Sequence, residues 1–162
     1  FISLLNEKDQ EYTPKTQVET KMPTKNYIKV KDDKLRNMNI KHFKLDEFDS
    51  PDEQGSGKNM DLAFLQKLDN CRELAGIPFK VNSGYRTERH NAAVGGVKNS
   101  PHKNIPCNAA DIHVAGSTER FKILKAALEV GFVRIGVGKN FIHLDTDTIK
   151  NKKSQNIVWH YY

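Results

Sequence analysis

Three residues in separate segments of the chain have side chains that bind zinc in proteins: His102, Asp111 and His143. The first two lie in VNSGYRTERHNAAVGGVKNSPHKNIPCNAAD, residues 81–111, and the third lies in FIHLDTD, residues 141–147. Two imidazoles and one carboxylate are the three protein ligands that a catalytic zinc site requires, with the fourth position left to water. We therefore predict a zinc centre at these three residues, with the rest of the chain as its scaffold.

The alternation of polar and apolar residues around Asp111 and His143 is typical of strands with one buried face. Alternate side chains of a strand share a face, so His143 lies on the face opposite Ile142 and Leu144. Two neighbouring strands can thus present Asp111 and His143 to a common point, over which a flexible loop brings His102. A set of nitrogen and oxygen ligands suits zinc.

Hydrolysis at such a centre needs a group that takes a proton from water and passes it to the leaving amine. Our candidate for this general base is Asp145, one strand repeat, roughly 6.5–7 Å, from His143 on the same face. His113 is the second choice. The alternative role for Asp145 is to orient the imidazole of a metal ligand by a hydrogen bond.

The SGYR segment supplies further candidates. Arg86 follows a tight turn at Gly84 and suits the binding of a substrate carboxylate or of a developing oxyanion, whereas its alternative role is a structural ion pair. Tyr85 beside it, and Ser100 two residues before His102, are further candidates for substrate contact.

Hydrophobic periodicity and turn residues indicate how these side chains are positioned. We expect residues 1–40 to form a poorly structured arm or linker and residues 41–162 to form one domain. Helices are predicted at residues 60–75, 87–94 and 118–130. Strands are predicted at residues 79–82, 109–114, 133–137, 141–145 and 156–159. Helices followed by closely spaced strands indicate an α+β domain, with a small antiparallel sheet packed against helices.

The sequence also predicts where these helices begin and end and which of their side chains face inward. Asn59 is the expected N-cap of the first helix and Gly76 its C-cap. Leu74 is expected on the inward face of that helix, and Phe121 and Leu128 on the inward face of the third. The aromatic residues near the end of the sequence are interpreted as core and edge packing rather than as a sugar-binding platform: Trp159, Tyr161 and Tyr162.

Composition limits the class of protein. The chain has 162 residues, 37% of them hydrophobic, and a net charge of +6. No apolar run approaches the ~20 residues of a membrane span, and no signal peptide is visible. The basic charge is compatible with a polyanionic partner, but no five-residue block of like charge occurs, so a solvated lysine-rich surface is favoured and nucleic-acid binding is not expected. Cys71 and Cys107 are too few for a disulfide framework, and we interpret them as free thiols.

In that order, the segments SGYRTERHN, AVGGVKNSPH, AADI and FIHLD resemble the M15 peptidases. This group of zinc D-Ala-D-Ala peptidases and peptidoglycan hydrolases shares its fold with the Hedgehog signalling domain. The similarity covers roughly residues 43–160 and is closest to the compact branch of bacteriophages and gut bacteria. It implies a Hedgehog/DD-peptidase-like fold, zinc ligation by His102, Asp111 and His143, and a substrate contact from Arg86. It also implies cleavage of cell-wall stem peptides beside a D-amino acid, in the cell envelope or periplasm or by a phage-associated protein.

Two departures from the family pattern bear on function. Nine positions separate His102 from Asp111, two more than in the family motif H-x-x-G-x-A-x-D, and Ile105-Pro106 stands where a glycine is usual. Several relatives carry an acidic base three residues before the last ligand, where this chain has Asn140. The leading hypothesis, which rests on the series of motifs, is a monomeric zinc peptidase, either carboxypeptidase or endopeptidase, acting on peptidoglycan peptides. The second, which Asn140 and the altered loop favour, is a catalytically weak zinc-containing module that binds cell wall or protein.

Overall fold

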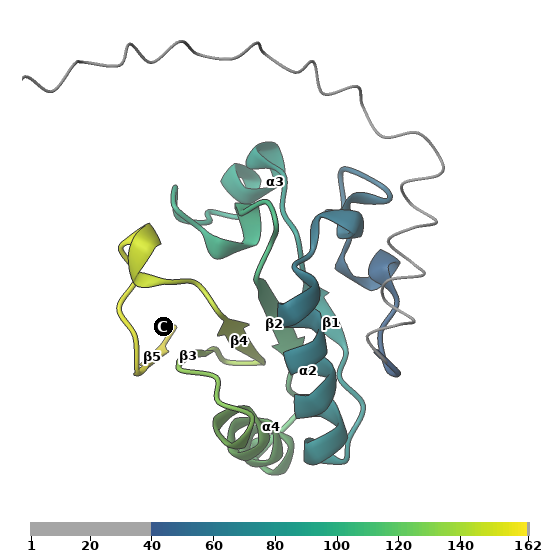
Figure 1. Ribbon diagram of the computed structural model, residues 1–162, viewed down its shortest axis with the longest axis vertical. Coiled ribbons are helices and arrows are strands. Elements are labelled where there is room, and N and C mark those ends of the chain that lie inside the picture. The colour runs from purple at the N-terminus through teal and green to yellow at the C-terminus, as the bar shows by residue number, and fades with distance from the viewer. Residues whose placement is uncertain (1–39, 162) are drawn as a thin grey trace, which may run out of the picture.

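The computed structural model of the protein describes residues 40–161, so the arm expected at residues 1–40 lies almost entirely outside the described part. Residues 40–161 contain three α-helices and five strands, together with four short 3-10 helices (Figure 1). The α-helices are α2 (Leu62–Ala75), α3 (Glu88–Ala93) and α4 (Ser117–Glu129). The strands are β1 (Val81–Ser83), β2 (Ala109–His113), β3 (Arg134–Val137), β4 (Phe141–Asp145) and β5 (Ile157–His160). The 3-10 helices are η1 (Leu45–Phe48), η2 (Ser56–Asn59), η3 (Pro101–Lys103) and η4 (Ile149–Asn151).

The strands form one sheet in the order β1-β2-β4-β3-β5. The α+β class is confirmed, but the sheet is mixed rather than wholly antiparallel. Strands β1, β2, β4 and β3 pair antiparallel, whereas β5 pairs parallel with β3. The reason is the connection after β4, which passes through η4 and returns the chain along the free edge of β3 in the direction of β3.

Helices α2 and α4 pack together on one face of the sheet (Figure 1). The N-cap of α2 is Asp61, whose Oδ1 atom accepts a hydrogen bond from Phe64 N at 2.9 Å. The expected cap Asn59 instead ends η2. Gly76 is the C-cap as expected, because its φ of 63° lies in the left-handed region that glycine adopts without strain.

The inward faces of the helices are narrower than the sequence pattern indicates. Phe121 and Leu128 on α4 are 67% and 60% exposed, and Leu74 on α2 is 52% exposed. The buried face of α4 contains Ala126 and Ala127, whose small side chains let the helix lie close to α2 and the sheet. The larger apolar residues on the flanks of that contact therefore remain in solvent.

The two faces of the sheet differ in chemistry. Ile142 and Leu144 of β4 belong to the hydrophobic core under the helices, so the residues between them point to the opposite face. Asp111 of β2 is the direct cross-strand partner of His143 of β4. The sheet thus positions a carboxylate and an imidazole side by side on the face that the two long helices leave uncovered.

Candidate metal centre

His102, Asp111 and His143 converge, and they form the only group of three potential metal ligands among residues 40–161. His143 Nδ1 lies 2.8 Å from Asp111 Oδ1 and 3.2 Å from His102 Nε2. His102 Nε2 lies 3.3 Å from Asp111 Oδ1. All three side chains are buried.

These distances fit one metal ion. Ligands bound tetrahedrally at 2.0–2.1 Å lie about 3.3 Å from each other, close to the three separations in the structure. Two imidazole nitrogens and one carboxylate oxygen are also a donor set that zinc accepts. The three side chains are therefore already arranged as one face of a tetrahedral site, and the fourth direction opens into a cleft.

His102 is held in place rather than carried on a flexible loop. It lies in η3, where Ser100 Oγ accepts a hydrogen bond from His102 N at 3.4 Å. Its Nδ1 atom lies 2.6 Å from the carbonyl oxygen of Gly84. Because a carbonyl only accepts, Nδ1 carries the proton and Nε2 presents its lone pair to the centre.

Gly84 fits this role because its backbone lies against Phe48. A Cβ atom at position 84 would lie 2.6 Å from Phe48 Cβ and 2.7 Å from Phe48 Cα. Tyr85 N also donates to Phe48 O at 3.0 Å, and Arg86 N donates to His102 O at 2.9 Å. The SGYR segment therefore connects η1 to the loop that carries the first histidine.

The longer loop between His102 and Asp111 leaves the ligands in register. Cys107 N donates to Asn59 O, and Cys107 O accepts from Asp61 N, each at 2.7 Å. Ile105 is 72% exposed. The two extra residues therefore bulge into solvent, while the two ends of the loop remain fixed.

His143 is oriented by Asp145, the residue that we predicted as the general base. Asp145 Oδ2 lies 2.9 Å from His143 Nε2, and Oδ1 accepts from Arg134 Nε at 2.6 Å and from Asp147 N at 2.9 Å. Asp145 is 0% exposed. Both of its oxygens are thus engaged away from the open coordination position. These contacts favour the alternative role, in which Asp145 orients the imidazole of His143. They do not support the role of general base, which stays a prediction.

Charge and burial set the protonation of the cluster. Burial lowers the pKa of His102, so its imidazole is neutral as a metal ligand must be. Burial alone would raise the pKa of Asp111, but the adjacent His102 and His143 outweigh it and lower that pKa. Burial opposes charge on His143 as well, but its hydrogen bonds to the carboxylates of Asp111 and Asp145 raise its pKa. The centre without metal therefore carries a carboxylate stabilised by imidazoles.

Arg86 forms the ion pair considered above as its alternative role. Its guanidinium lies 2.5 Å from Asp111 Oδ2, and its Nε donates to Ser83 Oγ at 2.7 Å. The first contact turns the other oxygen of Asp111 towards the histidines. Arg86 also lines the cleft above the centre, as does Ser100, so both remain available to substrate.

Three other residues do not line the cleft above the metal centre. Tyr85 is 8% exposed and belongs to the hydrophobic core, which contradicts its expected contact with substrate. The turn at the preceding residue rotates this side chain inward. His113 and Asn140 do not line the cleft either, so neither replaces the acidic base.

The sequence reasoning missed the aromatic wall of the cleft. The cleft has a volume of about 530 Å³, and Phe141, Trp159 and Tyr161 line it. The Trp159 ring lies 5.5 Å from the His143 ring and 6.2 Å from the Tyr161 ring, measured between centroids. Trp159 and Tyr161 were expected to be packing residues; Tyr162 lies outside the described residues.

In the sequence, Gly136 could have indicated that aromatic side chains pack against this strand. A Cβ at this position would lie 2.7 Å from Tyr161 Cε2 and 2.8 Å from Trp159 Cε2. A glycine within a strand often marks a close approach by another group. Arg134, two residues earlier, stacks on Trp159 with its guanidinium carbon 5.2 Å from the ring centroid.

The fold places a candidate metal centre in an open cleft. The family model described as Peptidase M15 matches residues 41–145, and the chain belongs to this family of metal-dependent peptidases. A search of curated proteins found no significant match. The matched range contains all three proposed ligands, together with Arg86 and Asp145.

Proposed function

We propose that the protein is a zinc-dependent peptidase that hydrolyses stem or cross-link peptides of bacterial peptidoglycan. The observation that carries the proposal is the convergence of His102 Nε2, Asp111 Oδ1 and His143 Nδ1 within 2.8–3.3 Å of one another. Membership of the M15 family supports peptidase activity. The choice of peptidoglycan rests on the motif resemblance described above.

Zinc is the metal that best suits two neutral imidazoles and one carboxylate in a tetrahedral arrangement. When bound, it would supply an activated water and polarise the scissile carbonyl. His102 and His143 each have the second ring nitrogen engaged, by Gly84 O and by Asp145 respectively. The ligands are therefore oriented before any metal binds.

The residues around the centre have distinct tasks. Arg86 holds Asp111 and presents its guanidinium to the cleft, where a substrate carboxylate or an oxyanion would accept from it. Trp159 and Tyr161 form an apolar wall that limits water on one side. A short peptide segment would thus lie between the aromatic wall and the guanidinium.

One observation favours a second candidate, the catalytically weak zinc-containing binding module. Asp111 and Asp145 are the only carboxylates among the described residues that line the cleft, and both are engaged by His143. The described residues that line the cleft therefore offer no free carboxylate to accept a proton from water. Efficient turnover would depend on another acceptor.

We also propose where the protein acts and in which oligomeric state. Among residues 40–161, every helix is too short or too polar to span a lipid bilayer. A substrate in the cell wall implies action in the cell envelope or periplasm, or by a phage-associated protein. We propose a monomer as the working state.

The test combines zinc content with hydrolysis of isolated peptidoglycan. Purified protein is analysed for metal, and new amino groups are measured with and without chelator; the nature of the released product separates carboxypeptidase from endopeptidase. His143→Ala removes a ligand, and His113→Ala is the matched control outside the cleft. One zinc per chain and chelator-sensitive release that only His143→Ala abolishes would support the peptidase. One zinc without release from several wall types would favour the binding module, and absence of zinc would overturn both.

A further inference from the structure

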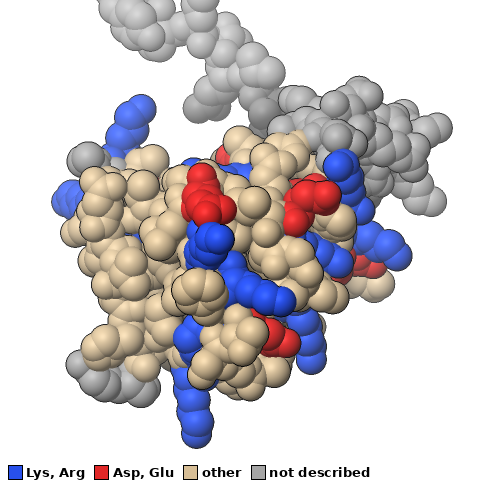
Figure 2. All heavy atoms as spheres, turned by 90° about the horizontal axis from the view of Figure 1, so that it is seen from below, with Lys and Arg blue, Asp and Glu red and all other residues tan. Residues whose placement is uncertain are grey.

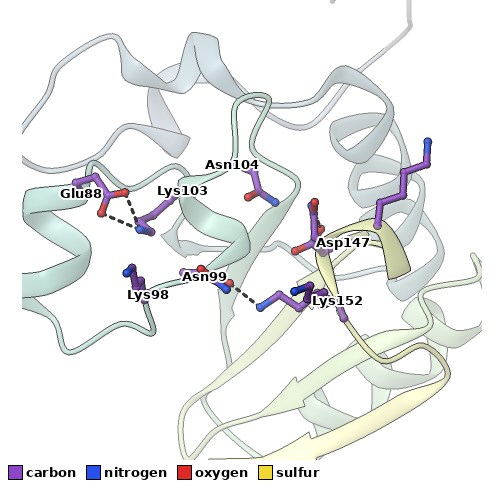
Figure 3. A pocket seen from close by; sticks show the side chains of 11 residues that line it. Glu88, Lys98, Asn99, Lys103, Asn104, Asp147 and Lys152 are labelled. Carbon is purple, nitrogen blue, oxygen red and sulfur yellow. Dashed lines mark hydrogen bonds and ion pairs between the residues drawn. The ribbon is translucent and has the colours of Figure 1, made fainter.

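A second hollow, with a volume of about 440 Å³, adjoins the metal cleft. Ser100 and Lys153 line both spaces, so the two lie side by side. One side of the hollow comes from the segment between α3 and β2, with Lys98, Asn99 and Lys103. The other comes from the connection between β4 and β5, with Asp147 and Lys152 (Figure 3).

The lining of this hollow is predominantly basic. It contains two acidic residues, Glu88 and Asp147, and five lysines: Lys98, Lys103, Lys150, Lys152 and Lys153. Such a concentration of one charge in a concave surface attracts an anion. The contrast with another face is clear, because Figure 2, which views the α2 and α4 end of the molecule, shows Lys and Arg side chains spread out with Asp and Glu among them.

The acidic residues of the hollow are already engaged. Glu88 binds Lys103, with both carboxylate oxygens 2.7 Å from Nζ (Figure 3). Asp147 Oδ1 accepts from Thr148 N at 2.9 Å and from Asn151 Nδ2 at 2.5 Å. The other lysines therefore have no carboxylate partner from these two residues.

Three ammonium groups have no acidic partner within residues 40–161: those of Lys98, Lys150 and Lys152. Lys153 Nζ instead donates to the carbonyl oxygen of Asn99 at 2.5 Å, which joins the two sides of the hollow. Unpaired like charges that share a hollow repel one another, and a bound anion relieves this repulsion.

The connection that carries these lysines has a defined conformation. Asn151 N and Lys153 N both donate to Thr148 O, at 3.0 Å and 3.3 Å. Lys152 has a φ of 59°, in the left-handed region that residues other than glycine rarely adopt. The backbone hydrogen bonds around it therefore position its side chain rather than leaving it to a free loop.

We propose that this hollow is a subsite for the carboxylate groups of an acidic peptide substrate. The proposal rests on the peptidase function and names the part of the substrate that the protein recognises beside the cleaved bond. Ser100 joins the hollow to η3, which carries the ligand His102, so one extended molecule can occupy both spaces. A peptide that occupies both spaces would place its side-chain or terminal carboxylates among the lysines of the hollow. Ammonium groups on flexible stems suit carboxylates in varied positions, whereas arginine suits one fixed geometry.

The test measures peptide binding to the zinc-loaded full chain by isothermal titration, separately from hydrolysis. The probes are an acidic stem peptide purified from peptidoglycan and the same peptide with its carboxylates converted to carboxamides. The variant Lys98→Gln/Lys150→Gln/Lys152→Gln is compared with Lys80→Gln/Lys122→Gln/Lys139→Gln. The control removes three exposed lysines outside both spaces, so the two variants have the same net charge.

The acidic peptide should bind the hollow variant about tenfold more weakly than it binds the wild type. The control variant should change affinity less than about twofold, since only long-range charge is lost. The carboxamide peptide should bind all three proteins equally. Equal binding of both peptides by the wild type, or equal losses in both variants, would overturn the proposal. Displacement of the peptide by inorganic polyphosphate at lower concentrations than by free acidic peptide would also overturn it, in favour of a phosphate polymer.

Failure of the proposal is distinguishable from failure of the peptidase function. A carboxylate preference that depends on the hollow supports the subsite even if no bond is cleaved. Cleavage without this preference supports the peptidase and rejects the subsite.

Discussion

The imidazole of His143 and the carboxylate of Asp145 form a buried pair on β4, with Nε2 2.9 Å from Oδ2. On the opposite side of the same ring, Nδ1 faces Asp111 and His102. Asp145 therefore determines which nitrogen of His143 is free to bind metal. Arg134 in turn keeps Asp145 ionised, because its hydrogen bond and that of His143 outweigh burial and lower the pKa of Asp145.

Replacement of Asp145 by Asn should lower zinc affinity about 10–100-fold, as expected for loss of a carboxylate that orients a ligand. Activity should recover in part when zinc is raised to saturation. Competition with a chromogenic chelator measures the affinity, and Asp147→Asn serves as the control because Asp147 does not touch His143. Wild-type zinc affinity with no turnover at saturating metal would instead identify Asp145 as the general base.

Replacement of Gly84 by Ala should weaken metal binding at least about tenfold and destabilise the fold by about 1–3 kcal/mol. The added Cβ meets backbone and Cβ atoms of Phe48, so the carbonyl that accepts from His102 must move. Gly116→Ala is the matched control, since a Cβ there meets nothing within 4 Å. Metal titration and thermal unfolding measure the two effects; equal behaviour of the two variants would contradict this explanation of Gly84.

Asp52 should stabilise the fold in a pH-dependent manner. Its carboxylate accepts from Ser50 Oγ at 2.5 Å, from Thr87 Oγ1 at 2.7 Å and from Arg89 Nε at 2.9 Å. These bonds, that of Ser50 foremost, lower the pKa of Asp52. A lowered pKa in the folded state stabilises the protein above the unfolded pKa of about 3.9, and this contribution declines as the pH falls below that value.

Thermal unfolding of Asp52→Asn should therefore show a lower Tm than the wild type at pH 7 and a smaller difference below about pH 4. Asp46→Asn is the control, because Asp46 is exposed and its side chain forms no hydrogen bond in the described part of the chain. A difference that stays constant between pH 7 and pH 3 would contradict the carboxylate as its source.

Cys71 and Cys107 should be unreactive in the folded protein. Both are free and buried, and burial raises the pKa of each thiol to about 12. Since the thiolate is the reactive form, a thiol reagent at pH 8 should label neither residue until denaturant is added. Mass spectrometry of the labelled chain identifies the sites, and rapid native labelling of Cys107 would show that its loop opens.

Local patterns and the order of the family motifs were sufficient to predict that His102, Asp111 and His143 come together. Alternation within FIHLD places His143 opposite Ile142 and Leu144, and the structure pairs it with Asp111 across two strands. The five strands, the three helices and the α+β class also follow from periodicity and turn residues. These features depend on side chains close together in the sequence, or on strand pairs with one buried face.

Features that depend on tertiary packing did not follow from the sequence. The parallel pairing of β5 with β3 has no local signal, and it alone brings Trp159 and Tyr161 beside His143. Tyr85 points inward because of the close approach of Gly84 to Phe48. The lysine-lined hollow joins residues from two distant segments. No single run of like charge in the sequence therefore predicted it.

Because β5 returns along β3, two separate parts of the chain contribute different residues to the site. All three proposed metal ligands and their orienting partners lie before residue 146, whereas the aromatic wall residues Trp159 and Tyr161, and three lysines of the hollow, come afterwards. Substitutions in the later part can alter which peptides are accepted while the earlier part retains its chemistry. Selection for a new peptide substrate could thus act on residues 147–161, and a designer seeking altered specificity would vary the same residues.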